Sequence, residues 1–229
     1  MKFKTKITKK SLVNHFKYYI WVYVVAMVLS GTFFSMSVTV INNQAPPENK
    51  LFTYICGDAI SIDYFTAFYE EMYDAMLDKF PEMKVVSCEN LSYNADGSMS
   101  NTYKEKFLSL IANNYGDVML LPYNEFADLA QNGLFEPIED DFAKYIGDVD
   151  PISLKTVTMS LKTESGEAET HIYGIPLRHL EFFPYFYDTT DKVLVITSYS
   201  QNKEKAKVLA EWYLDYMIET EWYGTLTRK

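Results

Sequence analysis

Apolar and polar positions along this chain follow two different patterns. From Tyr18 to Ile41, an apolar run of 24 residues contains no charged side chain. An α-helix rises about 1.5 Å per residue, so about 20 apolar residues suffice to cross the hydrocarbon core of a bilayer. Beyond residue 50, short β-prone runs alternate with segments whose apolar residues recur at helical spacing. The pattern predicts one membrane-spanning helix followed by an α/β domain.

The alternating part predicts a mostly parallel sheet with helices on both faces, because strands and helices take turns along the chain. Strands are expected at 51–56, 83–88, 117–121 and 192–197, with a further extended segment at 172–176. Helices are expected at 61–80, from 102 onward, and at 124–131, 151–161 and 203–218. A polar loop at 90–100 and a polar turn at 163–170 separate some of these elements.

The distribution of charge predicts how the apolar run is oriented in a membrane. Residues 1–17 carry six lysines and no acid, whereas all 31 acids lie in 48–229 beside the remaining 15 bases, a net charge of −16 for that part. Basic residues before a span favour the inside of a membrane. We therefore expect a basic cytoplasmic arm at 1–17, a transmembrane helix at 18–41, a linker at 42–50 and an extracytoplasmic domain at 51–229 of a single-pass cell-membrane protein.

A cleaved signal peptide is the alternative interpretation of the apolar run. The apolar core of such a peptide usually has about 7–15 residues and precedes a small-residue cleavage site. Here the run is longer, and only the weak Ser35-Met36-Ser37 lies near a plausible cut. An uncleaved anchor in the lipid bilayer is favoured.

Polar residues at the ends of the predicted strands are candidates for a ligand site. In open parallel sheets, ligands bind beyond the carboxyl ends of the strands. The alternative for each residue is an ordinary capping or solvated side chain. The candidates are Asp58, Glu89, Asn90, Tyr123 and Asn124.

Several kinds of chemistry are missing from the sequence. It contains no metal-ligand pair of histidines, no Walker A loop, no dinucleotide fingerprint and no nucleophile elbow, so we expect neither a metal, a cofactor nor an enzyme. The net charge of −10 argues against nucleic acid as a partner. Cys56 and Cys88 end two strands that should be neighbours; a disulfide between them is open, and two buried free thiols are the favoured state.

Four segments of the outer part resemble, in order, the extracellular solute-binding proteins of ABC importers, especially the sugar-binding class. The first two are similar to that family's helix, aspartate-led strand and glycine-leucine-proline segment; the third is similar to the stretch that leaves the first lobe, and the fourth to the returning strand and helix. They are 103–121 (YKEKFLSLIANNYGDVMLL), 126–140 (FADLAQNGLFEPIED), 172–176 (IYGIP) and 193–214 (VLVITSYSQNKEKAKVLAEWYL).

The resemblance implies a type II periplasmic-binding-protein-like fold, reduced to essentially the first lobe. Where the family inserts most of its second lobe, only residues 177–191 stand here. Arg178 and His179 follow the segment that approaches ligand in the family, so the resemblance adds them to the candidates. Carboxylates and amides would hydrogen-bond sugar hydroxyls, and Tyr123 would stack on an apolar sugar face.

Two functions follow as hypotheses. The first is a membrane-anchored, solute-capturing or accessory component of a carbohydrate ABC transport system, with a small sugar and a permease as partners. The second is a non-enzymatic interaction or sensor module that docks a membrane protein. For the second, the aromatic run at 182–187 is either an exposed interface or ordinary core.

Overall fold

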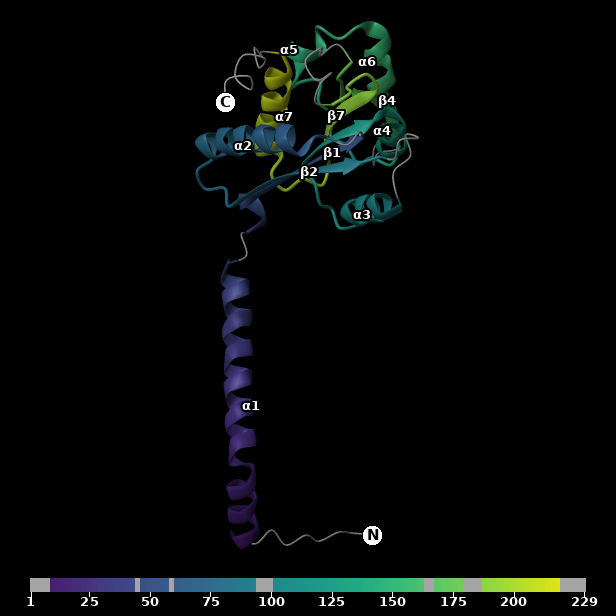
Figure 1. Cartoon of the computed structure of the whole chain (residues 1–229). Helices are drawn as coiled ribbons and strands as arrows, with labels where there is room; N and C mark the ends of the chain where they lie inside the picture. The colour runs from purple at the N-terminus through teal and green to yellow at the C-terminus, as the bar shows by residue number, and fades with distance from the viewer. Residues whose placement is uncertain are drawn as a thin grey trace, which may run out of the picture. The chain divides into compact units, whose positions relative to one another are not determined.

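The computed structural model describes residues 9–43, 46–57, 60–93, 101–162, 167–178 and 187–218 (Figure 1). The chain divides into two compact units, Met1–Ala45 and Pro46–Lys229. Most of the basic arm, residues 1–8, lies outside the described residues, as do Asp58, His179 and 182–186 of the aromatic run.

The first unit is the helix α1 (Lys9–Asn43). Its segment Val13–Met36 is long and apolar enough to cross a membrane, by length and composition. Bulky side chains there are exposed, among them Trp21 at 77% and Phe33 at 76%. Near the amino end, a hydrogen bond of 2.8 Å joins Nε2 of His15 and the hydroxyl of Tyr23.

A five-stranded sheet forms the centre of the second unit. Its strands are β1 (Lys50–Gly57), β2 (Val85–Ser92), β3 (Val118–Pro122), β6 (Ile175–Pro176) and β7 (Lys192–Ile196), in the spatial order β2-β1-β3-β7-β6. β1 pairs in parallel with both β2 and β3, whereas β7 is antiparallel to β3 and to β6. Four of the five strands therefore run in one direction, which confirms the predicted mostly parallel α/β fold.

Helices cover both faces of this sheet (Figure 1). Alternate residues of β1 divide between two cores: Leu51 and Ile55 pack with α2 (Ile62–Lys79) and α7 (Lys203–Ile218), whereas Tyr54 and Cys56 pack with the opposite layer. That layer contains α3 (Asn101–Ala112), α4 (Tyr123–Ala130) and α6 (Pro151–Val157). The period-two alternation of a strand buried on both faces produces this division.

The helix predicted at 151–161 is wrong in its second half. α6 ends at Val157, and β4 (Thr158–Lys162) follows and pairs antiparallel with β5 (Ala168–Ile172), part of which was expected to be a turn. Val157, Met159 and Leu161 alternate with hydroxyl residues, and all three pack on the α3–α4 core. This period of two places one side of the hairpin on the core, which a helix could not do here.

The extended segment predicted at 172–176 is also divided. β5 ends at Ile172, and Tyr173-Gly174 carries the chain across to β6. A Cβ atom at Gly174 would overlap with Cγ1 of Val193, so only glycine allows β6 to approach β7 this closely. A short helix, α5 (Ala143–Ile146), and a 3₁₀ turn at Pro47–Asn49 complete the described elements.

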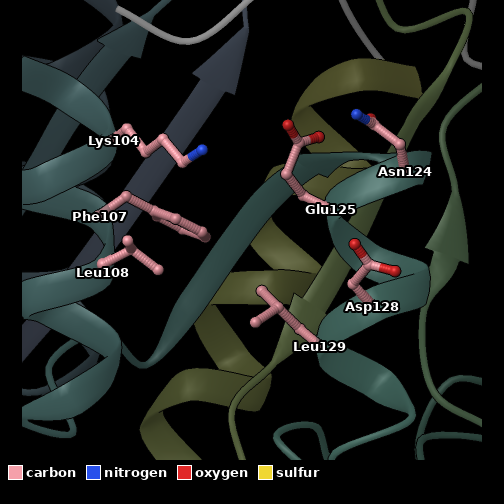
Figure 2. Close-up of a pocket in the computed structure, with 7 residues that line it drawn as sticks. All are labelled: Lys104, Phe107, Leu108, Asn124, Glu125, Asp128 and Leu129. Carbon is pink, nitrogen blue, oxygen red and sulfur yellow. The ribbon is translucent and has the colours of Figure 1, made fainter. Parts of the chain in front are cut away.

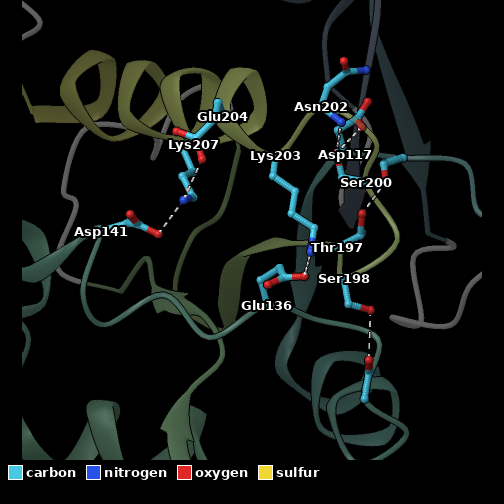
Figure 3. Close-up of polar contacts among 12 residues, drawn as sticks. Asp117, Glu136, Asp141, Thr197, Ser198, Ser200, Asn202, Lys203, Glu204 and Lys207 are labelled. Atoms are coloured by element: carbon cyan, nitrogen blue, oxygen red, sulfur yellow. Dashed lines mark hydrogen bonds and ion pairs between the residues drawn. The ribbon is translucent and has the colours of Figure 1, made fainter. Parts of the chain in front are cut away.

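A buried polar network fastens the edge at which β1 and β3 begin (Figure 3). Asp117 Oδ2 accepts a hydrogen bond from the Phe52 backbone N–H at 2.8 Å, and Oδ1 accepts one from the Ser200 hydroxyl at 2.6 Å. The Asn202 side chain donates to the backbone carbonyls of Pro47 and Lys50 at 2.8 and 2.7 Å. Burial raises the pKa of the Asp117 carboxyl, although these donors oppose the rise. The network joins the starts of β1 and β3 to the turn before α7.

The two cysteines do not form a disulfide. β1 and β2 are neighbours as predicted, but the register pairs Cys88 with Thr53 and Cys56 with Leu91. Cys88 belongs to the core of α2 and α7, and Cys56 to the core of α3 and α4, so their side chains lie on opposite faces. Both are buried free thiols, and burial raises the pKa of Cys88 to about 12.

Candidate functional site

The carboxyl ends of the parallel strands meet at one edge of the sheet, which we call the carboxyl edge. β1 ends there at Gly57, β2 at Ser92 and β3 at Pro122. After β1 the chain continues to α2 on one face, and after β3 to α4 on the other. Such a reversal between adjacent strands opens a crevice in doubly wound sheets and is where their ligands bind.

A pocket of about 410 Å³ lies between α3 and α4, the helices that follow β2 and β3 (Figure 2). We call it the α3–α4 pocket. Apolar side chains of both helices and charged side chains share its walls. Its lining residues are Lys104, Phe107, Leu108, Asn124, Glu125, Asp128 and Leu129.

Charged groups face one another across the pocket. Figure 2 shows the amine end of Lys104 directed from α3 toward Glu125 on α4. Among the residues that the structure describes, Lys104, Glu125 and Asp128 form no ion pair within 4.0 Å. Phe107, Leu108 and Leu129 supply an apolar surface beside them. An apolar body with a few polar groups is the usual composition of a small-ligand site.

A buried pair of polar atoms adjoins the pocket. The Tyr93 hydroxyl and Glu125 Oε2 are both shielded from solvent, and within the described residues no hydrogen bond of standard length and angle reaches either atom. Burial raises the pKa of Tyr93, and the charge of Glu125 and its interaction with the Tyr93 hydroxyl add to the rise. Burial and the Glu125 charge also raise the pKa of Cys56. Glu125 therefore places a shielded carboxylate oxygen at the carboxyl edge, with the Tyr93 hydroxyl as a neighbouring neutral donor.

The other side of the carboxyl edge is closed by its own contacts. The Tyr187 hydroxyl donates to the Cys56 carbonyl, and the largely buried Lys192 pairs with Asp191. Lys192 Nζ lies 5.7 Å from the centre of the Tyr187 ring. Gly57 has a φ of 140°, and a Cβ there would lie 2.8 Å from Cε of Lys192. These groups therefore satisfy one another on this side of the edge.

Two of the predicted site residues lie within β2 and not beyond it. The strand was expected to end at 88 but continues to Ser92. Glu89 forms an ion pair with Lys106 of α3, whereas the Asn90 amide donates to the Ile55 carbonyl at 3.1 Å. Adjacent strand residues point to opposite faces, so the side chains of Glu89 and Asn90 lie on opposite faces of the sheet.

The remaining predicted residues fall into three groups. Tyr123 and Asn124 begin α4; Tyr123 is 40% exposed, and Asn124 lines the α3–α4 pocket. Arg178 is exposed just after β6, outside that pocket. Asp58 and His179 are not among the described residues.

Sequence reasoning missed Lys104, Glu125 and Tyr93. Lys104 and Glu125 each lie within the first turn or two of a helix that starts at the carboxyl edge. That position was available as a signal once the helices had been predicted. Tyr93 follows the true end of β2, so the early strand boundary hid it.

A second pocket, of about 290 Å³, lies at the opposite edge, beside Asp117, Tyr115 and Tyr199. Its buried carboxylate is already satisfied by Phe52 and Ser200. Within the described ranges, no group of three or more His, Cys, Asp or Glu side chains is arranged to hold a metal ion. The α3–α4 pocket is therefore the candidate small-ligand site.

Comparison with known sequences gave no match to a protein family model and none to a curated protein. Solved structures similar to the chain are extracellular solute-binding proteins, the class that the four sequence segments resemble. A family 1 member from Alicyclobacillus acidocaldarius is 19% identical, with a TM-score of 0.38, over 58% of this chain and 29% of that one.

The N-glycan transport protein NgtS of Streptococcus pneumoniae, solved with Man5GlcNAc, is 16% identical with a TM-score of 0.37, over 56% of this chain and 24% of that one. The GacH receptor of Streptomyces glaucescens, solved with acarbose, is 18% identical with a TM-score of 0.36, over 55% and 29%. The present chain thus spans less than a third of the length of these proteins, and a likeness of this degree carries no argument about their activities.

Proposed function

We propose that this protein is a membrane-anchored, solute-binding-like lobe that captures a carbohydrate at the carboxyl edge of its sheet, as an accessory or capturing component of an ABC-type transport system. The α3–α4 pocket is the observation that carries the proposal. It places an amide, two carboxylates and an ammonium around an apolar wall, and the exposed Tyr123 directly precedes the lining residue Asn124 in α4. Sugars present the matching surface of hydroxyl groups and apolar C–H faces.

The anchoring part of the proposal rests on α1. Its apolar segment of 24 residues corresponds to a length of about 36 Å, enough for a hydrocarbon core of about 30 Å. The lysine-rich arm precedes it and the acidic domain follows it. This charge asymmetry supports an inner amino terminus and an outer domain.

Calorimetric titration of the full chain in lipid nanodiscs with a panel of mono- and oligosaccharides tests the proposal. We expect at least one sugar to bind. Asn124→Ala should lower the affinity for that sugar about tenfold, because it removes an amide that lines the pocket. Asn113→Ala, just after the far end of α3, is the matched control and should bind as the parent does. Absence of heat with every sugar would reject a carbohydrate ligand.

A second function is favoured by a different feature of the same edge. Ile62 and Tyr64 on the first turn of α2 are 81% and 42% exposed, and Tyr123 is 40% exposed. Large apolar side chains gathered at one edge are typical of a protein-binding surface. Recovery of one stoichiometric membrane protein by the parent, and its loss with Ile62→Asp, would support an interaction module; unchanged recovery with Ile62→Asp would reject this surface.

A further inference from the structure

We propose that the ligand of the α3–α4 pocket carries a positive charge, an amine on a sugar ring, and that Glu125 and Asp128 select it. This inference rests on the proposed carbohydrate-binding function and narrows its ligand class. Both acids belong to α4, one turn apart, and both line the pocket. Lys104 is the single basic residue among the lining residues, so the pocket carries one more negative than positive charge.

The Glu125 carboxylate is prepared for a cation. Most exposed acids lose their hydration when they form an ion pair, and this cost cancels much of the attraction. Glu125 Oε2 is already shielded from water, and no basic side chain of the described residues pairs with it within 4.0 Å. Part of the desolvation cost is therefore present before a ligand arrives, and an ammonium would add the missing positive charge.

Potential donors within the protein do not replace a ligand. Figure 2 shows Lys104 directed toward Glu125 from the opposite helix, yet the two form no ion pair within 4.0 Å. The Tyr93 hydroxyl interacts with Glu125 as a neutral donor, so it leaves the negative charge of the carboxylate uncompensated. The pocket, of about 410 Å³, separates α3 from α4 here and has room for a sugar ring.

The rest of the domain favours the same ligand charge. Residues 48–229 carry a net charge of −16, and such a field raises the local concentration of cations and their rate of association. Phe107, Leu108 and Leu129 provide an apolar surface for the C–H face of the ring. A neutral sugar would use this surface and the amide of Asn124, but would leave the Glu125 acceptor without a charged donor.

Calorimetric titrations with glucosamine, glucose and N-acetylglucosamine test the inference on the full chain in nanodiscs, at a pH of about 6, where an amine is protonated and ordinary carboxyl groups are ionised. We expect glucosamine to bind at least tenfold more tightly than either neutral sugar. Glu125→Gln should reduce that preference to less than threefold, and Asp128→Asn should reduce it in part.

The Lys104→Gln variant should change the glucosamine preference in the opposite direction. It removes the positive charge of the pocket and should increase the preference for glucosamine. Asp74→Asn and Lys79→Gln, exposed positions on α2, change the net charge of the domain by the same amounts and should leave the preference unaltered. A local effect of the pocket charges is thereby separated from the long-range field.

The outcomes distinguish this inference from the function on which it rests. Equal binding of all three sugars, or a glucosamine preference that Glu125→Gln leaves intact, would overturn the charged ligand while leaving carbohydrate binding in place. No binding of any sugar, together with no heat from the wider panel, would overturn both.

Discussion

Replacement of Asp117 by alanine should destabilise the domain more than any other single loss of a carboxylate described above. Asp117 is 6% exposed, and its two oxygens hold the Phe52 N–H and the Ser200 hydroxyl, from strand β1 and from the turn before α7. The alanine variant leaves both donors without an acceptor, because neither has another hydrogen-bond acceptor in the described part of the structure.

The size of the effect follows from the free-energy cost of buried donors that have lost their acceptor. Each buried group left without a partner costs about 1–3 kcal/mol. The pocket of about 290 Å³ beside Asp117 lets water reach them, and the variant no longer buries a carboxylate, so the lower half of the range applies. We expect a loss of about 3 kcal/mol in the free energy of unfolding, which lowers the urea midpoint by about 1.5 M at an m-value of about 2 kcal/mol/M.

The assay is urea unfolding of the full chain in detergent, followed by the fluorescence of Trp212. Its ring packs 4.8 Å from that of Tyr216 and 5.5 Å from that of Phe68, so unfolding changes its surroundings. Trp21 and Trp222 are replaced by phenylalanine to isolate this signal. The control, Asp74→Asn on the exposed face of α2, should lie within about 0.5 kcal/mol of the parent.

The pH dependence of the Asp117→Asn variant adds a second criterion. Because the pKa of Asp117 is raised in the folded state, the folded protein binds more protons than the unfolded chain between the two pKa values. The contribution of Asp117 to stability therefore falls as the pH rises through this window, and the asparagine variant lacks that fall. The parent's advantage over Asp117→Asn should be larger below the unfolded pKa than at neutral pH. A loss below about 1 kcal/mol for Asp117→Ala, or an advantage that grows with pH, would refute the reasoning.

Two substitutions and one chemical test give three further predictions about the buried parts of the domain. Tyr213→Phe removes a fully buried hydroxyl with hydrogen-bond partners and should cost about 1 kcal/mol in urea unfolding. Gly116→Ala forces a side chain onto a φ of 109° and to within 2.5 Å of Cε of Met119, so a loss of at least about 2 kcal/mol is expected, and a neutral variant would contradict the described turn. Cys56 and Cys88 should react with a thiol reagent only after denaturant is added, and a reductant should leave the unfolding midpoint unchanged.

The central strands could be predicted from the sequence because tertiary structure reinforces their local pattern. The run 117–121 is wholly apolar, and the observed β3 is buried on both faces. The segment 151–161 was different, because Pro151 and Asp150 give a sound helix start while nothing local marks its end. The hairpin β4–β5 replaces the last turn of the predicted helix because Met159 and Leu161 pack on the α3–α4 core, which is distant in sequence.

The site was harder to predict than the fold for a related reason. Polar residues within a strand look like residues beyond its end, and Glu89 and Asn90 were placed outside β2 for this reason. Their partners, Lys106 and the Ile55 carbonyl, become apparent only when the layers are assembled. Asn124, which lines the α3–α4 pocket, could be placed at a helix start because α4 begins within one residue of its predicted position.

Hydrogen–deuterium exchange of the full chain in nanodiscs, with and without a bound sugar, tests the central claim most directly. The account predicts slower exchange on sugar addition in the first two turns of α3 and α4, around residues 104–108 and 123–129, with little change at 113–117 and 197–202 on the opposite edge of the sheet. Protection confined to the opposite edge, or none at saturating concentrations of every sugar tested, would contradict a carbohydrate site at the carboxyl edge.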